Sequence, residues 1–253
     1  MEATRRDRKG PQILDKYGAL LSTPGARGFI VAGFLARMPL SMRGLGCVLM
    51  LVALTGSYGL AGAVAATLTL SQALTAPWLG RLADRHGQRR LLVFSLAAHS
   101  SGILLLVLAA QVSAPAWTLF PAAGLSGAAA LPVGSLVRAR WAGLVGGMPA
   151  LGTAFALESV IDEAVFVVGP VLVTALAVGV APAAGLLGPL VFAVVGSLSL
   201  AIQGNTEPGP LSEPRPAGRL AVLSSGLLVL ILSCVALGIV LSVIDLGMVA
   251  FAR

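Results

Sequence analysis

Charged residues are scarce in this sequence, because Asp, Glu, Lys and Arg together make up only 11% of its 253 residues. Soluble domains contain about 25% charged and about 45–50% apolar residues. Here 57% of the residues are hydrophobic and the mean hydropathy is +0.94. A water-soluble fold could not bury so much apolar surface. The composition therefore excludes an ordinary soluble domain and indicates a protein that folds in a lipid bilayer.

Residues that bind metals or form disulfide frameworks are also few, with two cysteines and two histidines in the chain. Cys47 and Cys234 lie far apart within apolar segments, so we interpret both as small buried hydrophobic side chains. The sequence shows no nucleotide-binding glycine loop and no nucleophile paired with a base. We therefore expect that the protein is not an enzyme and holds no metal and no cofactor.

Acidic residues number 10 against 17 basic ones, which gives a formal net charge of +7. Such a charge could suggest a nucleic-acid partner. However, the Lys and Arg residues lie in short segments between apolar runs and form no basic face on a polar domain. We therefore expect no binding of nucleic acid, and expect the basic residues to report on membrane orientation instead.

Long apolar runs recur along the chain, and about 20 apolar residues suffice to cross the bilayer as a helix. The stretch 1–27 is expected to form a polar tail and a short helix at the membrane surface. A six-helix bundle is expected over 28–203, a proline-rich linker over 204–218, and a seventh span with the chain end over 219–253. The predicted spans are 28–52, 57–79, 90–111, 115–137, 150–178, 183–203 and 219–250.

Arginine is distributed unequally among the segments that join these spans. The segments 55–58, 111–115 and 179–182 contain neither Lys nor Arg. The alternate segments carry Arg81, Arg85, Arg89, Arg90, Arg138, Arg140, Arg215 and Arg219. Because short basic loops stay in the cytoplasm, we expect a multi-pass plasma-membrane protein with a cytoplasmic N-terminus and the lipid bilayer as its partner.

The most specific motif is GRLADRHGQRR at residues 80–90, after the second predicted span. Gly80 allows two helices to approach closely, Gly87 allows the positive φ of a tight turn, and the arginines hold the segment in the cytoplasm. Asp84 is the single carboxylate among cationic side chains. From residue types alone, it could form no more than a solvated ion pair worth about 0–1 kcal/mol.

This segment resembles the signature loop of the major facilitator superfamily, whose pattern is Gly, any residue, Leu, Ala, Asp, Arg, any residue, Gly and then basic residues. Gln88 departs from it, because a basic residue is usual there. The resemblance implies that the loop gates one transporter conformation, with Asp84 pairing and capping a neighbouring helix. The motif residues that carry this implied role are Gly80, Leu82, Asp84, Arg85, Gly87, Arg89 and Arg90.

The resemblance extends over the six-helix N-terminal half of such a transporter and one helix beyond it. It implies an all-α membrane fold and secondary active transport of a small solute, with a proton as a candidate coupling ion. Gly169 and Pro170 resemble the glycine–proline kink of antiporters, although the surrounding glycines of that motif are absent and a packing kink is the alternative. The fourth span has no arginine before Arg138, unlike many proton-coupled exporters.

An odd number of spans leaves a second interpretation open. We expect the chain to be truncated relative to the usual twelve spans, because it ends soon after the seventh. It could therefore be a non-transporting truncated membrane protein, or a helix bundle that is the partner of another membrane protein. A second bundle from another chain could in principle complete the transporter.

Charges within the spans suggest a site. Glu158 and Asp162 differ by about 40° around a helix and share a face of the fifth span. Arg37 in the first span lies at a similar depth, and these two helices are neighbours in the resembled fold. We hypothesise that Arg37 pairs with Asp162 or Glu158 across the bundle, facing the cavity for a solute or proton. The alternative is an ion pair with a purely structural role.

Overall fold

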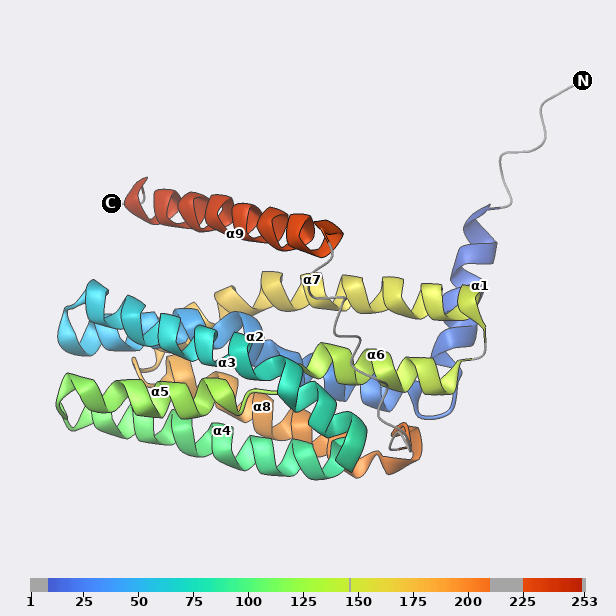
Figure 1. Ribbon diagram of the computed structural model, residues 1–253, viewed down its shortest axis with the longest axis horizontal. Coiled ribbons are helices and arrows are strands. Elements are labelled where there is room, and N and C mark those ends of the chain that lie inside the picture. Colours follow the sequence, from blue (N-terminus) through green and yellow to red (C-terminus); the bar gives the residue numbers. More distant parts are fainter. Residues whose placement is uncertain (1–8, 146, 210–224, 252–253) are drawn as a thin grey trace, which may run out of the picture. The chain divides into compact units, whose positions relative to one another are not determined.

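The computed structural model describes residues 9–145, 147–209 and 225–251, and the regular structure within these ranges is helical. The chain divides into two compact units, 1–211 and 212–253 (Figure 1). The helices of the first unit are α1 (Lys9–Leu21), α2 (Ala26–Thr55), α3 (Tyr58–His86), α4 (Gln88–Gln111), η1 (Ala116–Thr118), α5 (Leu119–Ala128), α6 (Val133–Leu144), α7 (Met148–Gly179), α8 (Ala184–Ile202) and η2 (Gly204–Thr206). The second unit contains α9 (Ser225–Phe251).

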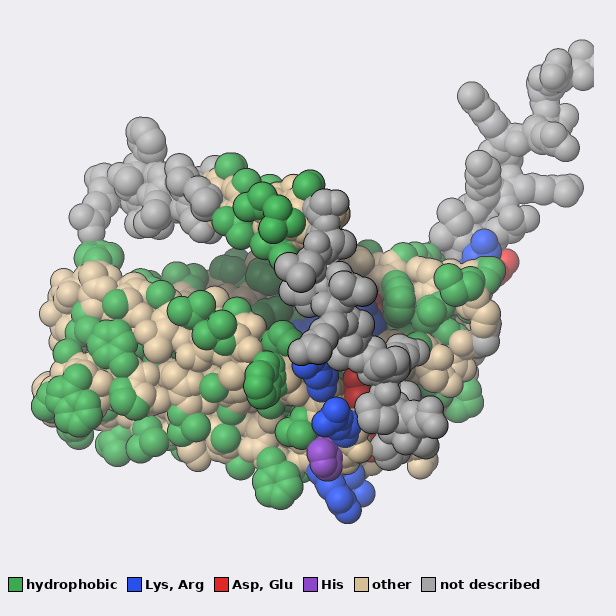
Figure 2. All heavy atoms as spheres, viewed as in Figure 1, with side chains coloured by type: hydrophobic (Ala, Val, Ile, Leu, Met, Phe, Trp, Pro, Cys, Tyr) green, Lys and Arg blue, Asp and Glu red, His purple; other side chains and the backbone are tan. Residues whose placement is uncertain are grey.

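Six helical segments of the described chain are long and apolar enough to cross a membrane: α2, α3, α4, the segment from η1 to α6, α7 and α8. Their outer faces are apolar, as Leu70, Leu74 and Trp78 of α3 show with exposed fractions of 60%, 66% and 74%. In the face drawn in Figure 2, hydrophobic side chains cover the helices while charged ones gather in a narrower zone. The chain is thus a multi-pass helical membrane protein whose surface contacts lipid.

The seventh predicted span overlaps α9, which has 27 residues. Within it, the described segment Gly226–Gly238 is an apolar helix. Residues 219–224 and most of the predicted linker, 210–218, lie outside the described residues. The seventh span therefore remains a prediction.

The prediction of a loop over residues 80–90 is wrong, because most of this segment is helical. Helix α3 continues to His86, and Gly87 alone separates it from α4. No residue between Gly80 and His86 interrupts the helix, and Leu, Ala and Arg are good helix formers. Gly87 has φ of 85° and donates its N–H to the Ala83 carbonyl at 2.9 Å. A conformation with positive φ suits glycine, so Gly87 ends one helix and starts the next.

The fourth predicted span is not one continuous helix. Helix α5 ends at Ala128 and α6 begins at Val133, so a non-helical segment interrupts the span in its middle. Pro132 explains the break, because proline has no N–H to continue the ladder and disfavours helical geometry at Leu131 before it. The break places irregular backbone inside the bundle, where it contributes to a cavity.

Helix α2 lies inside the first unit and packs most extensively on α8, then on α7. The close approach depends on glycine: a Cβ added to Gly46 of α2 would meet the backbone carbonyl of Gly185 in α8. Helix α4 packs on both α5 and α8, and α3 packs on α5. This arrangement buries two charged side chains of α2, Arg37 and Arg43, in the bundle interior.

The three inter-helix turns without Lys or Arg gather at one end of the bundle, away from the α3–α4 turn (Figure 1). By the positive-inside rule, a reporter that is active only outside the cell is expected to work when fused after Tyr58, Ala114 or Pro182. The same reporter should be inactive after His86. An active reporter after His86 would reverse the proposed orientation.

Candidate functional site

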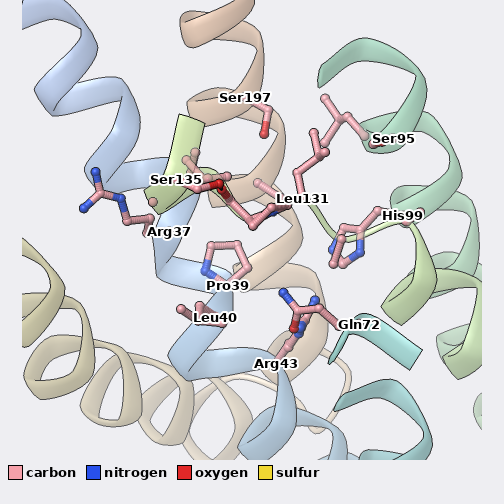
Figure 3. A pocket seen from close by; sticks show the side chains of 18 of the residues that line it. Arg37, Pro39, Leu40, Arg43, Gln72, Ser95, His99, Leu131, Ser135 and Ser197 are labelled. Atoms are coloured by element: carbon pink, nitrogen blue, oxygen red, sulfur yellow. The ribbon is translucent and has the colours of Figure 1, made fainter. Parts of the chain in front are cut away.

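A cavity of about 440 Å³ lies within the bundle and takes lining residues from all six candidate spans. This volume is within the usual range of small-molecule sites, about 300–1,000 Å³. Figure 3 shows side chains from several helices directed into it. Its polar and charged lining residues are Arg37, Arg43, Gln72, Ser95, His99, Ser135, Arg138, Asp162 and Ser197.

An ion-pair network joins three helices at one wall of this cavity. Arg37 of α2 donates a hydrogen bond from one terminal nitrogen to Glu158 of α7. Its other terminal nitrogen donates to Asp162 Oδ1 of α7 at 2.9 Å. Arg138 of α6 donates to the second oxygen, Asp162 Oδ2, at 2.6 Å. The structure therefore brings together Arg37 and both acids of the expected site, and adds Arg138 to them.

The two acids differ in their surroundings. Glu158 is fully buried, does not line the cavity, and accepts a second hydrogen bond from Trp141 Nε1 at 2.8 Å. Trp141 is itself fixed edge-to-face against Phe29, with ring centroids 4.7 Å apart. Asp162 is 31% exposed and lines the cavity. Glu158 thus binds Arg37 on the side away from the cavity, whereas the carboxylate of Asp162 faces the cavity.

Two further buried polar residues, Arg43 and His99, face the same cavity. His99 Nδ1 lies 2.9 Å from the Ser126 carbonyl oxygen and 3.0 Å from Ser126 Oγ, which ties α4 to α5. His99 is thus a hydrogen-bonding link between two helices. Nδ1 is engaged in this way, so the remaining ring nitrogen of His99 is the one left for the cavity.

The motif residues of 80–90 are mostly exposed. Asp84, Arg85 and Arg90 have exposed side chains, and within the described chain no ion pair to Asp84 is present. The side-chain hydrogen bonds of the motif to other elements come from Gln88, and the Arg89 backbone N–H donates to Glu207 Oε1 at 3.0 Å. Gln88 is 4% exposed and donates from Nε2 to the Leu136 carbonyl at 3.1 Å.

Arg140 of α6 forms the second buried network, and sequence reasoning assigned it to a loop. It is 1% exposed and donates from Nε to Gln88 Oε1 at 2.9 Å. Its terminal amines donate to the Leu200 and Gln203 carbonyls at the end of α8, each at 3.0 Å, and to Thr206 Oγ1 at 2.8 Å. Arg140 therefore joins the start of α4 to the end of α8 and satisfies helix-end carbonyls.

Gly169 and Pro170 lie in α7, which continues past them to Gly179. A Cβ on Gly169 would overlap Ser41 of α2, whose hydroxyl donates to the Val165 carbonyl at 2.8 Å. These contacts show close packing of α2 on α7 at this point.

A comparison of the chain with protein-family models, with curated proteins and with solved structures finds no match in any of the three. The candidate site is therefore interpreted from its own geometry and from the loop motif.

Proposed function

We propose that this protein carries out secondary active transport of a small solute, in the manner of the major facilitator superfamily. The observation that supports the proposal most strongly is the charged cavity inside an apolar bundle. A charge near the middle of the membrane costs about 2.5–3.5 kcal/mol on insertion scales, so buried charges around a cavity are typical of transport pathways. The signature-like segment 80–90 supports the same proposal.

Asp162 is the residue on which the proposed mechanism centres. Its two oxygens bind two arginines from different helices, Arg37 of α2 and Arg138 of α6, and it remains partly exposed to the cavity. A solute or a proton that reaches this carboxylate would weaken one or both ion pairs. The packing of α2, α6 and α7 would then depend on the occupancy of the cavity, which is what coupled transport requires.

Asp84 and the arginines around it form the proposed gate. Their exposure leaves them available to a second bundle, which in this proposal comes from the remainder of a longer transporter or from another chain. Replacement of Asp84 by Asn keeps the shape and removes the charge, so it should shift the balance between the two access states without preventing insertion.

Alternating access can be tested with one cysteine. Ser135→Cys places a thiol on the cavity wall, in a chain that also carries Cys47→Ala and Cys234→Ser. In oriented membrane vesicles, we expect a membrane-impermeant maleimide to label this thiol from both sides, because the cavity opens to each in turn. Asp84→Asn should change the ratio of the two labelling rates.

Ser22→Cys provides the control, since Ser22 lies in the exposed turn after α1 and should be labelled from one side only. If the Ser135 thiol reacts from one side only, with and without Asp84→Asn, alternating access is wrong. That result would favour the alternative, a non-transporting bundle that serves another membrane protein.

A further inference from the structure

Arg43 differs from the other arginines that line the cavity. It lies on α2, about 9 Å further along the helix than Arg37, and is 5% exposed. Arg37 and Arg138 bind carboxylates, whereas Arg43 has no ion pair and no hydrogen bond within the described part of the chain. A buried guanidinium without a counter-charge is costly and is usually paired in proteins.

The charges around the cavity do not balance. Three arginines, Arg37, Arg43 and Arg138, line it. The acids in contact with them are Asp162 and the buried Glu158, and both are engaged by Arg37. Of the three arginines that line the cavity, Arg43 is therefore the one without an acid among the described residues.

The surroundings of Arg43 offer further groups that favour an anion. Figure 3 shows Arg43, Gln72 and His99, from three different helices, bordering the same space. The first residues of α6, Val133, Gly134 and Ser135, line it as well. A helix N-terminus carries a partial positive charge, so the break in the fourth span places such a charge at the wall of the cavity that Arg43 also lines.

We propose that the cavity binds a small oxyanion, a carboxylate or a phosphate with one negative charge, and that Arg43 is its counter-ion. Gln72 and His99 supply hydrogen bonds to the remaining polar atoms of the ligand. An oxyanion would then be the solute of the proposed transport. Only the movement of the anion across the membrane rests on the proposed transport function. Binding itself requires only the cavity of the folded chain.

The test measures binding to the full chain in nanodiscs of zwitterionic lipid. Acetate, benzoate and inorganic phosphate serve as anionic probes, with choline and glycerol as cationic and neutral ones. We expect at least one anion to raise the unfolding temperature in a concentration-dependent way, and the other two probe classes to leave it unchanged. Arg43→Gln should weaken that anion's affinity at least about tenfold, because a charge-assisted contact is lost.

Arg27→Gln is the matched control, since Arg27 is an exposed arginine on the same helix and its replacement removes the same charge. It should bind the anion like the wild type. Without ligand, Arg43→Gln is expected to unfold at the same or a higher temperature, because an unpaired buried charge has been removed. Arg43→Lys keeps the charge and should retain part of the affinity, which separates lost binding from lost folding.

A response to all probes alike, or unchanged anion affinity in Arg43→Gln, would overturn the proposal.

A parallel measurement in nanodiscs that contain anionic phospholipid distinguishes the source of the anion. If stabilisation through Arg43 arises only when anionic phospholipid is added to the disc, the ligand is a headgroup phosphate, and oxyanion binding stands. Anion binding without two-sided labelling of the Ser135 thiol would contradict transport alone. Two-sided labelling without anion binding would contradict only the assignment of the solute.

Discussion

Glu158→Ala is expected to destabilise the folded protein by about 3–5 kcal/mol, among the largest effects of any single change. The reason is that Glu158 is fully buried and compensates Arg37, which is 3% exposed. Removing this acid leaves a guanidinium in a low-dielectric interior with Asp162 as its remaining partner, and removes the acceptor of Trp141 Nε1. Thermal unfolding of the purified protein in detergent measures the loss.

A double-mutant cycle tests whether the two residues act as a pair. Arg37→Ala should cost a similar amount, whereas the double change Arg37→Ala with Glu158→Ala should recover part of the loss. Asp162→Asn is the comparison, because Asp162 is 31% exposed and should contribute less to stability. Additive losses for Arg37 and Glu158 would show that their contact contributes no coupling energy.

Arg140→Met should have an effect of similar size, about 3–5 kcal/mol, because it removes four hydrogen bonds that a buried guanidinium donates. The buried Gln88 amide oxygen loses its donor, whereas the Leu200 carbonyl keeps the Gln203 N–H and the Gln203 carbonyl keeps the Thr206 hydroxyl. Methionine fills much of the same volume, so the loss would come from the hydrogen bonds and not from a cavity. Thermal unfolding measures the loss, and faster amide hydrogen exchange at the end of α8 would locate it.

Arg90→Met is the matched control, since Arg90 is an exposed arginine of α4 and should tolerate the change within about 0.5 kcal/mol. Arg140→Lys should remain destabilising, because an ammonium group cannot reproduce the spread of donors of a guanidinium. Equal stability of Arg140→Met and Arg90→Met would mean that the Arg140 network contributes nothing to folding.

The helical spans could be predicted from the sequence because apolar runs of span length have few alternatives in a bilayer. Their interruptions were harder to predict. The fourth span is apolar across Leu131 and Pro132, and hydropathy does not distinguish a continuous helix from a broken one. Likewise, the glycine and charges of the segment 80–90 suggested a loop, although only Gly87 has a positive φ there.

The pairing of Arg37 with Asp162 or Glu158 was predicted from helix periodicity, from depth along the spans and from the neighbouring places of the first and fifth helices in the resembled fold. Arg138 and Arg140 were assigned to a loop because the positive-inside rule treats every arginine near the end of a span alike. The contact of Arg138 with Asp162 depends on where α6 starts, and the burial of Arg140 depends on the carbonyls at the end of α8.

The break between α5 and α6 also has a mechanical consequence. Helix α6 is a short helix of 12 residues. Its helical backbone hydrogen bonds do not continue into α5. Arg138, which holds Asp162 in the cavity, and Arg140, which holds the end of α8, lie two residues apart on this helix. Any tilt or rotation of α6 therefore moves both contacts at once and couples the position of Asp162 at the cavity wall to the end of α8.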